Sequence, residues 1–390
     1  MNNAPQDNQA LLALVGQCDT RLWRLSADDR IRRLFARAGV GRVAKAGEDL
    51  PDSGTVILVR SDMVLDAPII AALTKTVGLL LLGPGPDGTR PVAAHVRAGD
   101  AAQVRTMLEQ GTTGSVLDGI DIRTVNTLGA NYWHALRKRE TPYLLELNPE
   151  NRRDVEWRSY MGTYKGVTDI VTKYVWPWPA FWATKLCVAL RLTPNMVTFV
   201  GLLLTISVCF LFADGHWTVG LIAAWLMCFL DTVDGKLARV TLTSSRFGNV
   251  FDHGIDLIHP PFWYAAWAYG LPDVGLPLSE SAFVWVLSII IGGYVAQRIV
   301  EGLFIHFFKM EQHVWRRTDS LFRLITARRN PNLILLTVFV ALGRPDWGLI
   351  AVAWWTALSL LFHLVRLAQA AQAKRRDGRL LSWLSEPTAS

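Results

Sequence analysis

The feature that most limits the fold of this chain is a series of long apolar segments between residues 195 and 372, rich in Trp and Phe. At least one of them reaches the roughly 18 uncharged, mostly apolar residues that indicate a membrane-spanning helix. Residues 1–160 have the composition of a soluble protein, so the overall hydrophobic fraction of 51% averages two different halves. The sequence predicts a soluble N-terminal part followed by an all-α membrane part.

The apolar segments divide into six predicted membrane spans, of which the fifth is the shortest. Their ranges are 195–213, 217–239, 247–270, 282–308, 331–343 and 347–370. Two connections, "ADGHW" and "GLPDVGLPLSES", contain no Lys or Arg, whereas the 309–330 connection has one Lys and five Arg, and the C-terminal tail has one Lys and three Arg. Arg344 is the exception to this alternation. By the positive-inside rule, both termini and the 239–247 connection lie in the cytoplasm.

The net charge of +7 has the same origin, because Lys and Arg cluster at the ends of the apolar segments. This pattern favours contact with membrane lipids and argues against a nucleic-acid partner. The first residues lack a basic region ahead of their short apolar stretch, so we expect no signal peptide. We expect an integral membrane protein of a bacterial inner membrane, with its active site on the cytoplasmic side.

The N-terminal part alternates helix and strand patterns, which is typical of an α/β layered domain. "SADDRIRRLFARAGV" predicts a helix with Ser26 as N-cap, and "TVILVR" predicts a strand. We expect four regions: a soluble α/β domain at 1–150, an interfacial amphipathic linker at 151–194, the six-span domain at 195–372 and a basic cytoplasmic tail at 373–390. The linker mixes basic and aromatic residues, as interfacial helices do.

Four aspartates stand at the cytoplasmic ends of the second and third predicted spans. Asp231 and Asp234 are three residues apart, and Asp252 and Asp256 are four apart, so each pair shares one helix face. A short link joins the two helices, so the four carboxylates can converge. Such a cluster repels itself unless cations fill it, and Mg²⁺ or Mn²⁺ suits oxygen ligands best. Intramembrane acids are costly and are usually functional.

With the small residues between them, these acids form the pattern D-x2-D-G-x2-A-R-x8-G-x3-D-x3-D. The positions are Asp231, Asp234, Gly235, Ala238, Arg239, Gly248, Asp252 and Asp256. This pattern resembles the signature of the CDP-alcohol phosphotransferase family over residues 160–372. The resemblance implies transfer of a phosphoalcohol group from a CDP-alcohol, either CDP-diacylglycerol or a CDP-linked polar headgroup, to an acceptor hydroxyl, with release of CMP. At least one of the two substrates would be a lipid, and the pathway would be phospholipid biosynthesis.

The resemblance also implies roles for individual residues. Asp231, Asp234, Asp252 and Asp256 would hold two Mg²⁺ or Mn²⁺ ions, and Asp256 would be the general base. The CDP moiety would lie against Asp231, Gly235, Ala238, Arg239 and Gly248. The family further implies a homodimer. Candidates for contact with the acceptor or a phosphate are His259, Arg298, Arg246, Lys165 and Lys173. Arg298 could instead pair with Glu301.

The stretch "ILVRSDMVLDAPIIAAL" resembles a sugar-phosphate nucleotidyltransferase domain over residues 20–150, with Asp62 at the metal-binding position. The glycine-rich phosphate-binding loop of that family is missing, so we expect this domain to be inactive in nucleotidyl transfer. The order of the two parts resembles fusions of inositol-phosphate cytidylyltransferase with dialkyl-phosphate synthase, which keeps a CDP-polyol donor open. A membrane scaffold or a transporter is the remaining alternative, although an ion path would place the acids nearer the membrane midplane.

Overall fold

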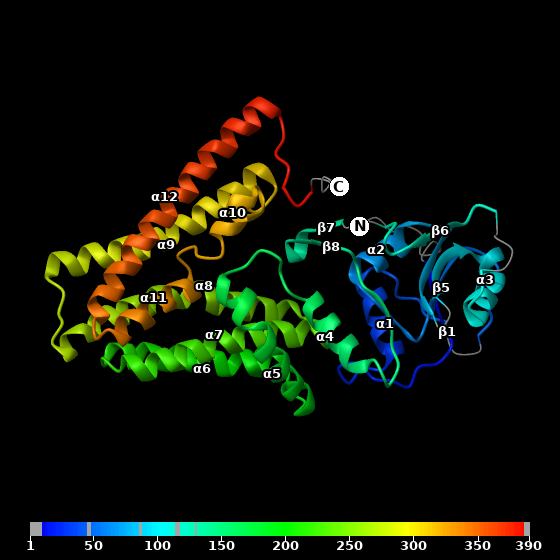
Figure 1. The fold of residues 1–390 in the computed structure, drawn as a ribbon, viewed down its shortest axis with the longest axis horizontal. Helices are drawn as coiled ribbons and strands as arrows, with labels where there is room; N and C mark the ends of the chain where they lie inside the picture. The colour runs from blue at the N-terminus through cyan, green and yellow to red at the C-terminus, as the bar shows by residue number, and fades with distance from the viewer. Residues whose placement is uncertain (1–9, 45–47, 86–87, 114–117, 129–130, 386–390) are drawn as a thin grey trace, which may run out of the picture. The chain divides into compact units, whose positions relative to one another are not determined.

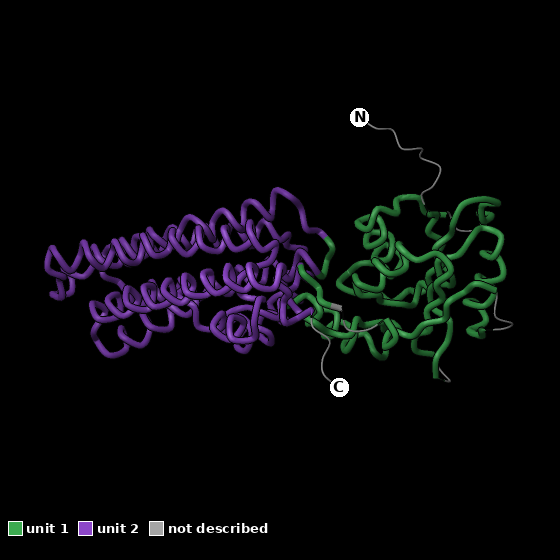
Figure 2. Tube along the Cα trace, turned by 90° about the horizontal axis from the view of Figure 1, so that it is seen from above, with its two compact units in different colours: residues 1–134, 139–164, 240–242 green, residues 135–138, 165–239, 243–390 purple. Residues whose placement is uncertain are grey.

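The fold is built from two compact units, which are described separately. In this computed structural model the described residues are 10–44, 48–85, 88–113, 118–128 and 131–385. Unit 1 comprises residues 1–134, 139–164 and 240–242, and unit 2 comprises 135–138, 165–239 and 243–390 (Figure 2). The first nine residues, on which the signal-peptide expectation partly rests, and the last five of the predicted tail lie outside the described ranges.

A five-stranded mixed sheet with the order β1-β2-β5-β4-β6 forms the centre of unit 1. Its strands are β1 Leu11–Val15, β2 Thr55–Arg60, β4 Leu79–Gly85, β5 Gly88–Arg97 and β6 Asp121–Thr124. The outer pairs β1·β2 and β4·β6 are parallel, and the inner pairs are antiparallel. Two short two-stranded sheets pair β3 Met63–Leu65 with β9 Leu144–Glu146 and β7 Asn131–Trp133 with β8 Lys138–Glu140.

Helices cover both faces of the five-stranded sheet (Figure 1). Alternate residues of β2 divide between the faces: Ile57 joins the core beneath α1 (Ala27–Arg37) and α2 (Ala67–Lys75), and Leu58 joins the core beneath α3 (Ala98–Gln110). Ser26 accepts a hydrogen bond from the Asp29 amide at 3.1 Å, so the predicted N-cap of α1 is confirmed. The α/β class is confirmed, and the likeness to nucleotidyltransferases stays a prediction.

The predicted linker contains three helical pieces. They are α4 (Arg152–Gly162), the π-helical turn η3 (Val171–Val175) and α5 (Pro177–Ala189). On α5, Trp178, Trp182 and Leu186 follow one another at intervals of four residues and are all exposed. This apolar stripe is what an interfacial helix presents to lipid.

Seven α-helices from α6 onwards form the rest of the described part of unit 2. Their bounds are α6 Pro194–Ala213, α7 Trp217–Val240, α8 Arg246–Gly270, α9 Glu280–Phe308, α10 Arg317–Phe322, α11 Arg329–Ala341 and α12 Pro345–Asp377, with short turns η4 (Leu271–Val274), η5 (Gln312–Val314) and η2 (His134–Leu136). Each predicted span coincides with one of these helices. Among the described residues, α6, α7, α9 and α12 are long and apolar enough to cross a membrane. The count of six spans therefore stays a prediction, because α8 is more polar and α11 has only 13 residues.

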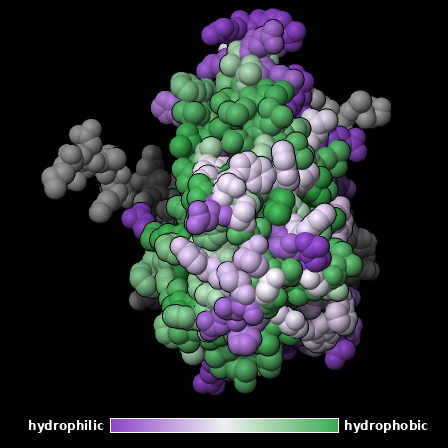
Figure 3. Space-filling view, turned by 90° about the vertical axis from the view of Figure 1, so that its left-hand side faces the viewer, coloured by the Kyte–Doolittle hydropathy of each residue, from purple (hydrophilic) through white to green (hydrophobic). Residues whose placement is uncertain are grey.

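The core of unit 2 is aromatic and its outer surface is apolar. Trp267 is fully buried, and its ring centroid lies 4.7 Å from that of Phe212 and 4.8 Å from that of Trp217. On the outside, Phe210 and Ile222 are about two-thirds exposed (67% and 65%). Figure 3 shows such apolar side chains spread over one face of the molecule, between patches of hydrophilic ones. Apolar residues on both sides of a helix are expected where lipid replaces water.

The helix connections place all four aspartates at one end of unit 2. Short turns join α6 to α7 and α7 to α8, so these neighbours run antiparallel (Figure 1). The end of α7 and the start of α8 consequently meet, and the end of α9 and the start of α11 lie at the same end of the helices. Polar residues from distant parts of the sequence can therefore share one site.

Candidate active site

Three aspartates on two helices form an acidic cluster. Asp231 lies near the end of α7, and Asp252 and Asp256 lie in the first half of α8. One carboxylate oxygen from each residue can be chosen so that all three lie within 4.8 Å of one another. The i, i+4 spacing on α8 and the tight turn between the helices produce this convergence.

Asp234, the fourth aspartate, is held by a neighbouring helix. Its side chain is 3% exposed, and its Oδ2 accepts a hydrogen bond from the hydroxyl of Thr198 on α6. Its Oδ1 is buried and has no hydrogen-bond partner among the described residues. A buried carboxylate oxygen without a partner is costly, which indicates that a ligand satisfies it.

Arg329, the first residue of α11, lies among the acids. Its Nη2 is 2.5 Å from Oδ2 of Asp231, and its Nη1 donates to Oδ1 of Asp256. The guanidinium therefore joins α7 to α8 and compensates two carboxylates that would otherwise repel each other. The sequence interpretation counted Arg329 only as a basic charge in a connection.

A small cavity of about 110 Å³ lies beside the acids, and it collects the small residues of the signature. It is lined by Gly235, Ala238, Arg239, Gly248, Asp234 and Asp252, with Asn195 and Thr198 from α6. A Cβ atom on Gly248 would lie 2.7 Å from Oδ1 of Asn195, and one on Gly235 would lie 3.0 Å from Nη2 of Arg239. Larger side chains at either glycine would narrow this cavity.

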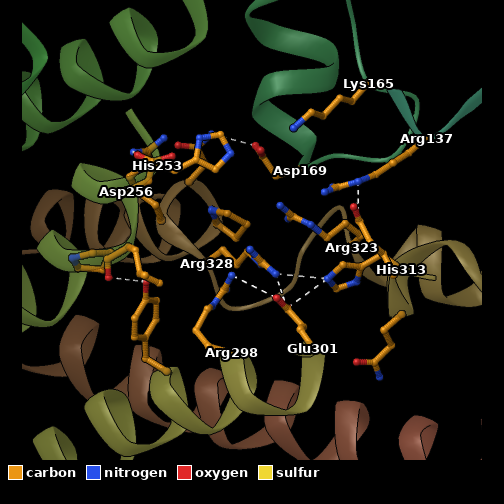
Figure 4. A pocket seen from close by; sticks show the side chains of 18 of the residues that line it. Arg137, Lys165, Asp169, His253, Asp256, Arg298, Glu301, His313, Arg323 and Arg328 are labelled. Carbon is orange, nitrogen blue, oxygen red and sulfur yellow. Dashed lines mark hydrogen bonds and ion pairs between the residues drawn. The ribbon is translucent and has the colours of Figure 1, made fainter. Parts of the chain in front are cut away.

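A larger cavity of about 450 Å³ opens on the other side of Asp256 and is strongly charged (Figure 4). Six basic and four acidic side chains line it: Arg137, Lys165, Arg298, Arg323, Arg328 and Arg329, with Asp169, Asp256, Glu301 and Glu311. Both cavities touch His253. The two spaces therefore meet at the start of α8, where the acids lie.

Glu301 on α9 gathers the charges on one wall of the large cavity. Its Oε2 lies 3.2 Å from Nη1 of Arg298, and its Oε1 accepts from Arg328 and lies 3.3 Å from Nε2 of His313. The pairing of Arg298 with Glu301, one of the two alternatives left open by the sequence, is present. Burial holds the pKa of His313 well below its usual value, so this ring is neutral at pH 7.

Lys165 and Arg323 also line the large cavity. Burial, together with the positive charges of Arg137, Arg239 and Arg323, lowers the pKa of the Lys165 amine to about 8. Burial, and then the charge of Arg328, lowers the pKa of Arg323 to about 9. Burial and neighbouring positive charges therefore disfavour the protonated forms of both side chains.

Comparison with known proteins shows that the segment carrying this site matches a known family. The sequence profile of the CDP-alcohol phosphatidyltransferase family matches residues 191–327, which contain all eight positions of the signature. Residues 191–327 are a CDP-alcohol phosphatidyltransferase domain. The resemblance inferred from the aspartate pattern is thereby confirmed.

Several curated proteins are similar to this phosphatidyltransferase domain. Cholinephosphotransferase 1 of Xenopus laevis is 34% identical over 137 residues, which is 32% of this chain and 33% of that protein. Ethanolaminephosphotransferase 1 of Homo sapiens is 38% identical over 82 residues, or 17% and 21% of the two chains. Archaetidylinositol phosphate synthase of Pyrococcus horikoshii is 38% identical over 73 residues, or 18% and 38%. The chain spans about a third of the length of the first of these relatives.

The donor atoms of the phosphatidyltransferase domain fit a hard divalent cation. The cluster offers only carboxylate oxygens, it brings three of them within 4.8 Å, and Asp234 adds a buried oxygen without a partner. Mg²⁺ and Mn²⁺ prefer such ligands. The guanidinium of Arg329 bridges Asp231 and Asp256 and so already provides cationic charge between them.

The structure brings some of the predicted acceptor residues to the domain's cavities and leaves others outside. Lys165 and Arg298 line the large cavity. His259, Arg246 and Lys173 line neither cavity. The Nδ1 atom of His259 lies 2.7 Å from the Ile255 carbonyl oxygen, and the ring is buried against Trp263. Arg246 and Lys173 are exposed.

Other residues of the large cavity were missed by the sequence analysis. Asp169 accepts hydrogen bonds from the Thr172 amide at 3.0 Å and from Nδ2 of Asn330 at 3.0 Å, which ties η3 to α11. His313 and Arg323 come from the 309–328 connection, where their only visible signal was basic charge. Nothing in their spacing indicates that they line one cavity with Lys165.

Unit 1 holds the predicted metal-binding residue of the nucleotidyltransferase resemblance. The carboxylate of Asp62 is engaged by two arginines, with Oδ2 at 2.7 Å from Nη2 of Arg60 and at 2.9 Å from Nη2 of Arg90. Arg90 also lies 2.9 Å from Oε1 of Glu146. This network neutralises Asp62 without a metal ion.

Proposed function

We propose that the chain is an integral membrane phosphotransferase that moves a phosphoalcohol group from a CDP-alcohol to an acceptor hydroxyl and releases CMP. The observation that carries this proposal is the convergence of Asp231, Asp252 and Asp256 within the matched domain, with the small residues of the signature around an adjoining cavity. The relatives named as cholinephosphotransferase and ethanolaminephosphotransferase support the same reaction class.

The small cavity would bind the CDP moiety. Gly235, Ala238 and Gly248 leave room for a flat group against α7 and α8, and Arg239 at its edge supplies a positive charge for a phosphate. The pyrophosphate would then lie beside the aspartates. Asp231, Asp234 and Asp252 would hold the ions, with Asp256 as a further ligand. Two Mg²⁺ or Mn²⁺ ions, when bound, neutralise the charge of the pyrophosphate and of the departing CMP.

Asp256 would remove the proton from the acceptor. It borders the large cavity, so an alcohol there can reach both this carboxylate and the pyrophosphate. The hydroxyl oxygen forms a bond to the phosphorus that carries the donor's alcohol, and the bond from that phosphorus to the CMP oxygen breaks. The proton passes to Asp256, and CMP leaves with the electron pair. A positioned general base contributes roughly 10²–10⁴-fold to such a step.

The direct test is CMP release by the purified full chain in nanodiscs. A panel of CDP-alcohols should include CDP-diacylglycerol and CDP-linked polar headgroups, each with lipid and polar acceptors and with Mg²⁺ or Mn²⁺. We expect metal-dependent CMP release with at least one combination and none with EDTA. Absence of release from every donor, by protein that still binds Mn²⁺, would contradict the proposal.

We also propose a membrane arrangement for the phosphatidyltransferase domain. All six helices α6, α7, α8, α9, α11 and α12 would cross the bilayer of a bacterial inner membrane, with both termini and the aspartates on the cytoplasmic side. The basic 309–328 connection and tail support this orientation. At the opposite end, Arg344 is paired with Asp346 at 2.6 Å, which reduces its weight as an orientation signal. Cysteine-accessibility labelling of intact cells tests this topology.

For the N-terminal domain we propose a docking or structural role without nucleotidyl transfer. The missing glycine-rich phosphate-binding loop supports this, and the predicted metal ligand Asp62 is paired with Arg60 and Arg90. Asp62→Ala should leave CMP release unchanged. Incorporation of CTP into any alcohol phosphate by the full chain would overturn this role. A homodimer is proposed from the family resemblance alone, and its test is light scattering of the detergent-solubilised protein.

A further inference from the structure

The cations of the large cavity differ in whether a carboxylate neutralises them. Arg298 and Arg328 share Glu301, and Arg329 is held by Asp231 and Asp256. Arg137 lies 2.5 Å from Oε2 of Glu311. These four cations are therefore occupied by acids of the chain itself.

Lys165 and Arg323 are the two cations of this cavity without an ion pair among the described residues. The Nε and Nη1 atoms of Arg323 are buried and lack hydrogen-bond partners in the same described part of the chain. The nearby Asp169 forms no ion pair with either residue: its Oδ1 accepts from the Val171 and Thr172 amides and from Asn330, and its charge acts on Arg323 from a longer distance. Figure 4 shows Lys165, Arg323 and Asp169 directed towards the same part of the cavity.

Lys165 and Arg323 are half-buried, and acids act on them only from beyond ion-pair distance. The buried Nε and Nη1 donors of Arg323 have no partner among the described residues, which is unfavourable unless an anion binds beside them. The cavity is about 450 Å³, which exceeds the need of an isolated phosphate and leaves room for an alcohol beside it. Lys165 provides a point charge and Arg323 a planar fork, a combination suited to phosphate oxygens. Asp256, on the same cavity wall as His253, faces the other part of this space.

We propose that the large cavity selects an acceptor alcohol carrying a phosphate group, with Lys165 and Arg323 binding the phosphate while the hydroxyl lies towards Asp256. This rests on the proposed function and adds the substrate class of its acceptor. A neutral acceptor such as an uncharged diacylglycerol would leave both cations without an ion pair. Arg298, a candidate from the sequence, is not the anchor, because Glu301 already holds it.

The test measures anion binding without turnover. The full chain in phosphatidylcholine nanodiscs, with EDTA present, is treated briefly with acetic anhydride, and acetylation of Lys165 is quantified by mass spectrometry. We expect inorganic phosphate and glycerol 3-phosphate to slow acetylation of Lys165 at least about twofold, as half-occupancy or more would. Glycerol, which lacks the phosphate, should have no effect. Exposed Lys173, eight positions away, is the internal control and should react equally in all samples.

Variants separate a built anion site from general screening. Arg323→Gln should abolish the protection of Lys165 by phosphate, whereas Arg323→Lys should retain part of it. Arg298→Gln should leave protection in place. The proposal is overturned if phosphate protects Lys165 no better than chloride, or if correctly folded Arg323→Gln is protected as well as the wild type.

Additional samples of the acetylation experiment, with other ligands and other nanodisc lipids, identify the source of the phosphate. Protection by glycerol 3-phosphate in phosphatidylcholine nanodiscs assigns a soluble alcohol phosphate. Protection seen only in phosphatidylglycerol nanodiscs supports the anion site and assigns a lipid headgroup. Protection by a CDP-alcohol equal to that by phosphate would show that the cations serve the donor, and would overturn the proposal. CMP release is measured separately. Failure of the proposed function would appear as absent CMP release, whereas failure of the acceptor proposal would appear as absent protection of Lys165.

Discussion

Nη2 of Arg329 lies 2.5 Å from Oδ2 of Asp231, so the first residue of α11 compensates an acid near the end of α7. The same guanidinium reaches Asp256 on α8. One partly buried cation thus ties α11 to the consecutive helices α7 and α8, which lie far from it in sequence. The acids of the phosphatidyltransferase domain consequently have a counter-ion supplied by the chain itself.

Removing that counter-ion should make folding depend on divalent metal. Arg329→Gln leaves Asp231 and Asp256 facing each other, and we expect a lower Tm in EDTA. Loss of one partner of a fully buried pair costs about 3–5 kcal/mol, so the cost at this partly exposed site should be smaller. Mg²⁺ should raise the Tm of Arg329→Gln more than that of the wild type. Equal Mg²⁺ effects in both proteins would show that Arg329 does not compensate the metal-binding acids.

The acidic cluster should bind Mn²⁺ in the absence of any substrate. We expect electron paramagnetic resonance titration to detect bound Mn²⁺ in the wild type and at least about tenfold weaker binding in Asp231→Asn and Asp252→Asn, because each loses one charged oxygen ligand. Asp273→Asn, an exposed acid at the opposite end of the helices, is the matched control. Undiminished Mn²⁺ binding in both cluster variants would place the metal elsewhere.

A single methyl group on Gly248 should obstruct the small cavity. The Cβ atom of Gly248→Ala would lie 2.7 Å from Oδ1 of Asn195, which itself lines that space. Overpacking of this kind costs about 1–3 kcal/mol. We expect the KM for the CDP-alcohol to rise about tenfold, which is 1.4 kcal/mol. Gly292→Ala is the control, since a Cβ there meets no atom within 4 Å. Equal kinetics of the two variants would remove the small cavity from donor binding.

Phosphate binding in the large cavity should weaken as pH rises through about 8. Burial and the charges of Arg137, Arg239 and Arg323 lower the pKa of the Lys165 amine to about 8, although Glu311 acts to raise it. The amine is therefore protonated below that pH and neutral above it. An anion gains attraction only from the protonated form. We expect phosphate binding, measured by ³¹P line broadening, to decline between pH 7.5 and 9.5. Lys165→Arg should move this decline to higher pH, and identical profiles would exclude Lys165.

The sequence predicts local features of this protein well because local signals determine them. Ser26 caps α1, and "TVILVR" is β2. Each predicted span coincides with a helix, since charged residues, Gly or Pro stand at the ends of the apolar segments, although α12 continues seven residues beyond the predicted end at 370. The convergence of Asp231 with Asp256 also followed from helical spacing and a short connection.

Contacts between distant segments could not be predicted from the sequence. Lys165 and Arg323 are separated by more than 150 residues and share a cavity only because α9, the 309–328 connection and the segment before η3 all border it. Arg329 shows the same limit, because its position at the start of α11 gives no hint of Asp231. The number of spans also stays open, since α8 carries the polar residues of the site and α11 is short.

The central claim is that Asp256 is the base in a transfer that forms one CMP for each phosphoalcohol moved. The most direct measurement follows CMP and the labelled product together, using a donor labelled in its alcohol, for the wild type and Asp256→Asn at equal protein and Mg²⁺. We predict equal amounts of CMP and product from the wild type. We predict a loss of roughly 10²-fold or more in Asp256→Asn, while donor binding is retained. Equal rates for the two proteins would contradict the assignment of Asp256, and CMP formed without product would contradict transfer to an acceptor.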